Sequence, residues 1–203
     1  MSTPYPWRTS AAAAITQSTL VPLTDGAALA MRGAADDDLA ELMALHASCS
    51  PRTLAGRYLN DGRAPRRRVQ RSLLHTDIAL VAHAPLGSLV GIGNVATSED
   101  DRSVAEIAVL VRDDWQGRGL GTGLLRQLVA GARVLGYGEV IAIAPTTGSW
   151  VQAALARLGN PLLQRTPFGE AVVRLRLAPH HVGLLGRPAA HTPRVNVSRP
   201  GVA

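Results

Sequence analysis

Four glycines stand at every second position in the stretch "DDWQGRGLGTGLLRQL" (113–128), between an apolar run and a helix-forming run. They are Gly117, Gly119, Gly121 and Gly123. Glycine lacks a Cβ, so a main chain this bare lets a ligand come close to its N–H groups. A phosphate bound there would also be stabilised by the positive end of the dipole of the following helix. The pattern favours a phosphate-binding turn, and a glycine-rich turn without any ligand is the alternative.

Two other phosphate-binding designs do not fit this stretch. The Walker loop needs a lysine beside a serine or threonine, and the chain contains no lysine. The dinucleotide fingerprint needs G-x-G-x-x-G, but Thr122 and Leu124 stand where its third glycine would be. That fingerprint also normally opens a fold, whereas these glycines follow an apparent hairpin. What remains is a turn whose successive N–H groups point at a pyrophosphate.

Such a turn needs a strand before it and a helix after it, and the hydrophobic periodicity supplies both. Strands are predicted at 27–32, 77–84, 89–97, 104–111, 139–145 and 170–178. Helices are predicted at 36–47, 50–59 and 149–158, and from the last glycines to Gly136. An early hairpin followed by a strand–helix–strand crossover predicts an α/β domain with a mixed sheet.

The ends of the chain differ in composition from its middle. Residues 1–24 are predicted to be a mobile leader, 25–178 the folded domain, and 179–203 a disordered tail rich in Pro, Arg and His. The net charge is +6, but four of these charges lie in the two ends, which disfavours a nucleic-acid-binding face. No signal peptide or membrane span is recognised, so a cytoplasmic protein without a membrane partner is expected. One cysteine excludes an internal disulfide.

The stretch "VRDDWQGRGLGTGLL" resembles the acetyl-coenzyme A signature of the GNAT N-acetyltransferase superfamily, Gln/Arg-x-x-Gly-x-Gly/Ala. Gln116, Gly119 and Gly121 fill its defining positions. The resemblance spans 27–178 and implies the GNAT fold, with about six or seven strands, about four helices and a sheet splayed between its fourth and fifth strands. "AEIAVLVRDDWQGRGLG" and "HASCSPRTLAGRYL" are similar to the bacterial Pat-type protein-lysine acetyltransferases, whose early helix reads SP-T---R.

The resemblance implies acetyl-coenzyme A as cosubstrate and no metal. It implies that backbone amides hold the pyrophosphate at Gln116, Gly117, Arg118, Gly119, Leu120, Gly121 and Thr122. It also implies that Val109, Leu110 and Val111 offer backbone hydrogen bonds to the pantetheine arm, as at a sheet edge. The partner implied is an amine acceptor, either a protein lysine or a small molecule, and the chain is expected to be a monomer or a homodimer.

Glu106 is the only carboxylate inside the apolar strand before the glycines. An alkyl ammonium with a pKa of about 10.4 must lose a proton before it can attack a thioester. Burial would raise the pKa of Glu106 toward that of a useful general base, whereas a glutamate at a strand end facing solvent is the other interpretation. In the Pat-type resemblance the glutamate of "AE-A" is the base, and a backbone N–H in 108–110 is the expected oxyanion donor.

Two departures from the family concern the leaving thiolate. Many GNAT enzymes protonate it with a tyrosine four residues before the glycine that closes the fourth helix, and Leu155 stands there. The asparagine common near the start of that helix is replaced by Gly148 and Ser149, and Ser149 is a weak substitute for the acid. A thiolate with a pKa of about 8.5 can leave unassisted. The alternative function is a degenerate GNAT domain that senses acyl-coenzyme A.

Other chemically active residues have structural interpretations. His46 continues an apolar helix face, so a catalytic pair with Cys49 is disfavoured, and His180–His181 lack further metal ligands. The arginine cluster is a solvated face, or it binds the adenosine 3′-phosphate or an acidic substrate surface. Its members are Arg63, Arg66, Arg67, Arg68 and Arg71.

Overall fold

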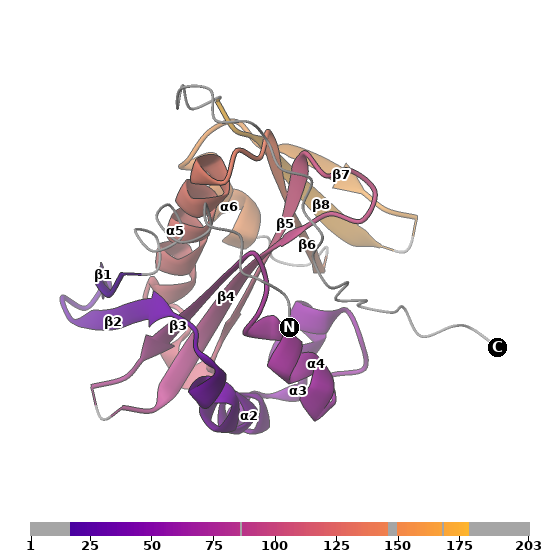
Figure 1. Ribbon diagram of the computed structural model, residues 1–203. Helices are drawn as coiled ribbons and strands as arrows, with labels where there is room; N and C mark the ends of the chain where they lie inside the picture. Colours follow the sequence, from indigo (N-terminus) through magenta and orange to yellow (C-terminus); the bar gives the residue numbers. More distant parts are fainter. Residues whose placement is uncertain (1–16, 86, 146–149, 168, 179–203) are drawn as a thin grey trace, which may run out of the picture.

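The computed structural model describes residues 17–85, 87–145, 150–167 and 169–178. In this part of the chain, eight strands form one sheet in the order β1-β2-β3-β4-β5-β6-β8-β7 (Figure 1). The strands are β1 (Thr19–Pro22), β2 (Ala28–Gly33), β3 (Ile78–His83), β4 (Leu89–Thr97), β5 (Val104–Val111), β6 (Glu139–Pro145), β7 (Leu162–Arg165) and β8 (Glu170–Arg176). The α-helices are α2 (Leu39–Ser48), α3 (Pro51–Tyr58), α4 (Arg67–Leu73), α5 (Leu120–Val134) and α6 (Trp150–Ala156), and the 3₁₀ turns are η1 (Asp36–Asp38) and η2 (Asp113–Trp115).

The sheet is mixed, as the sequence predicts. Strands β1 to β5 are antiparallel neighbours, and β5 and β6 form the parallel pair that α5 connects. Strand β8 then pairs antiparallel with both β6 and β7. The α/β prediction is confirmed, and the described sheet has more strands than the six or seven expected.

The two faces of the sheet carry separate cores. Helices α5 and α6 cover one face, where Leu124 and Leu128 of α5 belong to the same cluster as Ile107 of β5. Helices α2, α3 and α4 cover the other face, where Leu54 of α3 belongs to the same cluster as Leu110 of β5. Figure 1 shows these two helix groups on opposite sides of the strands. Residues of β5 therefore alternate between the two sides, as a pleated strand requires.

Three elements were not predicted, each for a physical reason. Strand β7 is exposed at all four residues, so it carries no inside–outside alternation. Helix α4 has seven residues, three of them arginine, and only Gln70 and Leu73 are buried. Strand β1 is four residues long, and a single residue in it, Val21, is buried.

Strand β1 also corrects the predicted boundary of the leader. Val21 is 4% exposed and Leu23 is 6% exposed, and both belong to the core on the α5 side. The folded domain therefore includes residues that were assigned to the leader. Residues 1–16 and the predicted tail 179–203 lie outside the described residues. Within the described part, no helix is long and apolar enough to cross a membrane.

Candidate active site

The glycine turn joins η2 to the first turn of α5. Gly117 and Gly119 have φ values of +71° and +91°, a left-handed conformation that glycine adopts without strain. Gly119 is the N-cap residue of α5, and no side chain caps this helix. Among the described residues, no acceptor bonds the backbone N–H groups from Gly117 to Thr122. This run of open donors at a helix start suits an anion such as a pyrophosphate.

The other two glycines are explained by packing. A Cβ on Gly121 would lie 3.1 Å from Cη2 of Trp150. A Cβ on Gly123 would clash with Cγ1 of Val21 in β1. Packing alone therefore accounts for the absence of a side chain at Gly121 and Gly123, whether or not a phosphate binds there. Small residues there let β1 and α6 lie close to α5.

The side chain of Arg118 is held by other protein groups beside the turn. Its Nε donates a hydrogen bond to Asp25 at 2.9 Å, and its guanidinium lies 4.2 Å from the ring centroid of Trp115. Its carbonyl accepts a hydrogen bond from Thr24 N–H at 3.0 Å. These contacts anchor the turn to the loop between β1 and β2. Arg118 can thus offer its backbone amide, whereas its charge is already paired.

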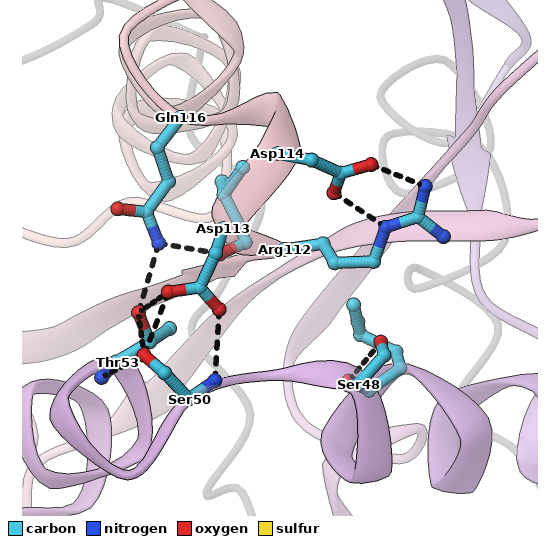
Figure 2. A network of polar contacts seen from close by, with 9 residues as sticks. Ser48, Ser50, Thr53, Arg112, Asp113, Asp114 and Gln116 are labelled. Carbon is cyan, nitrogen blue, oxygen red and sulfur yellow. Dashed lines mark hydrogen bonds and ion pairs between the residues drawn. The ribbon is translucent and has the colours of Figure 1, made fainter.

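Gln116 has a structural role in this arrangement. Its Nε2 donates to the carbonyl of Val111 at 2.9 Å and to the hydroxyl of Thr53 at 3.0 Å. Its own backbone N–H donates to the backbone carbonyl of Asp113 at 3.2 Å. This amide is therefore not open, although the resemblance implied that it is. Figure 2 shows the Gln116 side chain reaching Thr53 beside Asp113 and Ser50. The signature glutamine therefore fastens the end of β5 to α3.

Strands β5 and β6 pair only at their beginnings. The last β5 residue in the parallel ladder is Glu106, opposite Ile141, although both strands continue beyond this point. Arg112 and Val104 bond to β4 at either end of the β4–β5 ladder, so even-numbered residues of β5 direct their backbone groups toward β4. Val109 and Val111 therefore direct theirs toward the open side. This confirms a splayed sheet, and the prediction that Leu110 offers its backbone groups there is wrong.

Glu106 stands where the two strands part. It shares its side of β5 with Leu110, so its side chain lies on the face of the sheet covered by α2, α3 and α4. It is an exposed residue, yet the protein around it reduces its hydration and raises its pKa above the usual value. The negative charges of Glu99 and Asp100 raise this pKa further, and Arg57 opposes them. The carboxylate is thus accessible and more basic than an ordinary glutamate.

Arg57 of α3 was not chosen from the sequence, although it is the arginine of "SP-T---R". Its guanidinium donates to Oδ1 of Asn94 in β4 at 3.1 Å and lies 4.9 Å from the ring centroid of Tyr58. Its Nε is buried and has no partner among the described residues. Asn94 is paired with Ala108, two residues beyond Glu106 on β5. A positive charge is therefore fixed on the same side of the sheet as the carboxylate.

Several other predicted positions can be placed. Leu155 is fully buried in the core on the α5 side of the sheet, and Gly148 and Ser149 lie outside the described residues.

His46 is buried and bonded to the carbonyl of Leu42 and to Tyr58, and burial raises the pKa of the Cys49 thiol to about 11. This pair is structural. The described residues hold no group of side chains suited to a metal, and His180–His181 fall outside them.

The arginine cluster lies on and just before α4. Among the described residues, no hydrogen bond or ion pair joins it to the glycine turn. Arg66, Arg67, Arg68 and Arg71 are all exposed. Its location is on the side of the sheet that carries Glu106 (Figure 1).

Known structures share this fold at low sequence identity. The GNAT domain of S. lividans PAT superposes with a TM-score of 0.69 and 21% identity, over 79% of this chain and 97% of that one. A phosphinothricin acetyltransferase from Sinorhizobium meliloti, in complex with acetyl-coenzyme A, gives 0.61 and 19% over 76% and 94%. A ribosomal-protein-alanine N-acetyltransferase from Brucella melitensis gives 0.57 and 22% over 72% and 99%. None of the curated protein sequences matches the chain.

The sequence itself matches a protein family. Residues 41–159, more than half of the chain, match the acetyltransferase (GNAT) family. This span contains the glycine turn, the strand with Glu106 and the helix with Arg57. The chain therefore belongs to the GNAT acetyltransferase family, which confirms the predicted enzyme class, an acetyl-coenzyme A-dependent N-acetyltransferase.

Proposed function

We propose that the chain transfers the acetyl group of acetyl-coenzyme A to a primary amine of a protein lysine, with Glu106 as general base. The observation that carries the proposal is the position of Glu106, an accessible carboxylate of raised pKa at the point where β5 leaves β6. Beside it runs the open backbone edge of Val109 and Val111. The proposed base, a strand edge that can pair with an extended ligand, and the run of open amides from Gly117 to Thr122 thus follow one another along the chain.

The residues present fit the cosubstrate. The open N–H groups from Gly117 to Thr122 suit its pyrophosphate, which needs several donors and no bulky side chain. Along the open edge, the N–H of Val111 and the carbonyl of Val109 face the amides of its extended arm, as in strand addition. The carbonyl of Val111 already accepts from Gln116, and the N–H of Val109 is left for the thioester carbonyl.

In the proposed reaction the amine nitrogen attacks the thioester carbonyl carbon directly. Glu106 accepts the proton that the ammonium group must lose, through one water molecule, because a neutral amine is the nucleophile. The N–H of Val109, the one donor in 108–110 that faces the open side, stabilises the oxyanion as it forms. The carbon–sulfur bond then breaks, the sulfur leaves as thiolate, and the nitrogen, which attacked as a neutral amine, loses its second proton to water as the amide forms. Leu155 supplies no acid, and a thiol with a pKa of about 8.5 does not require one.

The choice of a protein lysine rests on the similarity of "AEIAVLVRDDWQGRGLG" to the Pat-type enzymes. A small amine is the alternative acceptor, and the solved relatives include both a ribosomal-protein-alanine N-acetyltransferase and a phosphinothricin acetyltransferase. The buried Leu155 favours one further candidate, a domain that binds acyl-coenzyme A without turning it over.

One experiment separates these three functions. The protein is incubated with acetyl-coenzyme A labelled in its acetyl group and a cell lysate, and label is followed into proteins and into small molecules. Label in protein that disappears with Glu106→Gln, and not with Glu99→Gln as the control for the same charge change, supports the proposal. Label in small amines alone rejects the lysine acceptor. Binding of acetyl-coenzyme A without any transfer rejects catalysis and leaves the sensor.

A further inference from the structure

Helix α4 and the residue before it carry a patch of arginines that the acetyl-transfer site does not use. Arg66, Arg67, Arg68 and Arg71 are exposed, and no carboxylate pairs with them among the described residues. Arg67, Arg68 and Arg71 line one shallow hollow on the surface. We call these four residues the arginine patch. Four uncompensated positive charges within two turns are an unusual local concentration in a chain body that is nearly balanced.

The patch lowers the stability of the helix that carries it. Arg67 and Arg71 are four residues apart, where like charges repel each other. The first turn of α4 contains cations and no acidic residue, although a helix dipole favours anions there. Neutral polar side chains would be better for folding. A negatively charged partner is what would turn this arrangement into a favourable one.

The extent of the patch limits the kind of partner. On one side Asp61 pairs with Arg63 at 3.0 Å. On the other side, just beyond the end of α4, Asp36 pairs with His75 at 2.9 Å. A long polyanion or an anionic membrane lying over α4 would therefore meet paired charges, and no further free cations, at these two positions. A short segment with two or three carboxylates fits between them, and each arginine can bind a carboxylate with two parallel hydrogen bonds.

Helix α4 is connected directly to the surroundings of Glu106. Asn94 donates a hydrogen bond from Nδ2 to the carbonyl of Leu73, the last residue of α4, at 2.7 Å. The same side chain accepts from Arg57 at 3.1 Å, and Arg57 is the cation that acts on Glu106. The arginine patch and the proposed base thus lie on one side of the sheet (Figure 1). Asn94 connects them, because it bonds both to the end of α4 and to Arg57.

We propose that the arginine patch docks an acidic segment of the acceptor protein, a short run of Asp or Glu that places a nearby lysine at Glu106. This inference rests on the proposed function, because it assigns the patch to the acceptor of that reaction. The partner is recognised by charge, so binding is expected to weaken as salt is added. Rim charges of this kind affect binding of the acceptor and leave the chemical step unchanged.

A binding measurement tests the patch without any turnover. Fluorescence anisotropy follows a labelled lysine-free peptide containing three glutamates, with a glutamine peptide of equal length as control. Full-length protein is expected to prefer the glutamate peptide by about tenfold. The preference should disappear in the triple variant Arg67→Gln, Arg68→Gln, Arg71→Gln. It should persist in Arg126→Gln, Arg157→Gln, Arg165→Gln, which removes the same charge from exposed positions elsewhere.

Three binding results would overturn the proposal. The first is equal affinity for the two peptides, or an equal loss in the two triple variants. The second is tighter binding of a single-stranded oligonucleotide of matched charge, or of vesicles rich in anionic lipid. The third concerns the α4 variant, the triple variant of Arg67, Arg68 and Arg71. If it loses affinity for coenzyme A but not for dephospho-coenzyme A, the arginines bind the 3′-phosphate instead.

Kinetics then separate docking from the proposed chemistry. Lysine peptides flanked by glutamate should show a KM about tenfold below that of glutamine-flanked peptides, with the same kcat, and only the α4 variant should remove the difference. Equal KM values would reject the acidic preference and leave the acetyltransferase activity standing. If neither peptide is acetylated although the glutamate peptide binds, the assignment of the patch to an acceptor is overturned together with the lysine acceptor.

Discussion

The carboxylate of Asp113 accepts hydrogen bonds from both the N–H and the hydroxyl of Ser50, at 2.8 and 2.7 Å, although 63 residues separate the two. Ser50 is the N-cap residue of α3, and Thr53 in the first turn of this helix donates to the same carboxylate at 2.8 Å. The start of α3 is thereby fixed to the turn between β5 and the glycines (Figure 2). Because Arg57 is on α3, this contact also sets where that cation stands relative to Glu106.

Replacing Asp113 with asparagine should loosen this connection. A neutral amide offers one acceptor oxygen to three donors, so Asp113→Asn is expected to lower the free energy of unfolding by about 1 kcal/mol at this exposed site. Urea denaturation at pH 7 measures the change. Asp114→Asn, which breaks an exposed ion pair with Arg112, is the matched control and should cost less. Equal losses in the two variants would show that the contact between Asp113 and α3 stabilises the fold no more than an exposed ion pair does.

The same contact gives a dependence of stability on pH. Partial burial opposes ionisation of Asp113, but the hydrogen bonds from Ser50 and Thr53 outweigh it and lower its pKa. A carboxyl group with a lowered pKa in the folded state stabilises the fold above its unfolded pKa, and this stabilisation is lost as pH falls through the folded pKa. The difference between wild type and Asp113→Asn should therefore be constant near neutral pH and shrink below pH of about 4. A difference that stays constant down to pH 2 would contradict this.

Two opposite changes near Glu106 test its role as the base. The acidic limb of kcat/KM reports the pKa of the base in the free enzyme, which must be deprotonated to work. Glu99→Gln removes a charge that raises the pKa of Glu106, so the limb should move to lower pH. Arg57→Gln removes the charge that lowers it, so the limb should move to higher pH. Titration of the acceptor is common to all three enzymes, and a limb that moves in neither variant would exclude Glu106.

The chemistry of Cys49 predicts its reactivity. Burial raises the pKa of its thiol to about 11, and the negative charge of Asp113 adds to this effect. Because the thiolate is the reactive form, the folded protein should react with iodoacetamide at pH 8 at least about a hundredfold more slowly than the protein unfolded in urea. Mass spectrometry of the labelled chain gives both rates. Rapid labelling of folded protein would instead make Cys49 a candidate nucleophile.

The sequence predicts the centre of this fold better than its edges. Strands β5 and β6 have the predicted bounds, 104–111 and 139–145, because each is an apolar run with a single glutamate, between polar or glycine-containing turns. Strand β7 was missed because an exposed edge strand has no buried face to alternate with. Its pairing with β8 supplies the stability that its side chains do not, and pairing is not visible in local periodicity.

The candidate site was predictable as a set of positions but not as a set of contacts. The spacing of the glycines located the turn, and the apolar strand located Glu106. The approach of Arg57 to that strand depends on how α3 packs on β5, which no spacing within one segment encodes. The direction of backbone groups at Leu110 likewise depends on the register with β4.

Gly123 offers a direct test of what the glycines do. A methyl group there would overlap Cγ1 of Val21 in β1, and Val21 is buried whereas Gly123 is half-buried. Gly123→Ala is expected to lower the free energy of unfolding by about 1–3 kcal/mol through overpacking. Val21→Ala alone should also destabilise the protein, because it removes two buried methyl groups.

Combining the two substitutions should restore much of what each one loses, because the added methyl group then occupies the space that Val21 vacates. Urea denaturation of the two single variants and the double variant gives the coupling free energy, expected to be at least about 1 kcal/mol. Gly117→Ala, at a φ of +71° with no atom near its Cβ, should cost about 1–2 kcal/mol from backbone strain and show no coupling to Val21→Ala. Strict additivity for Gly123 and Val21 would show that β1 does not require a glycine at position 123.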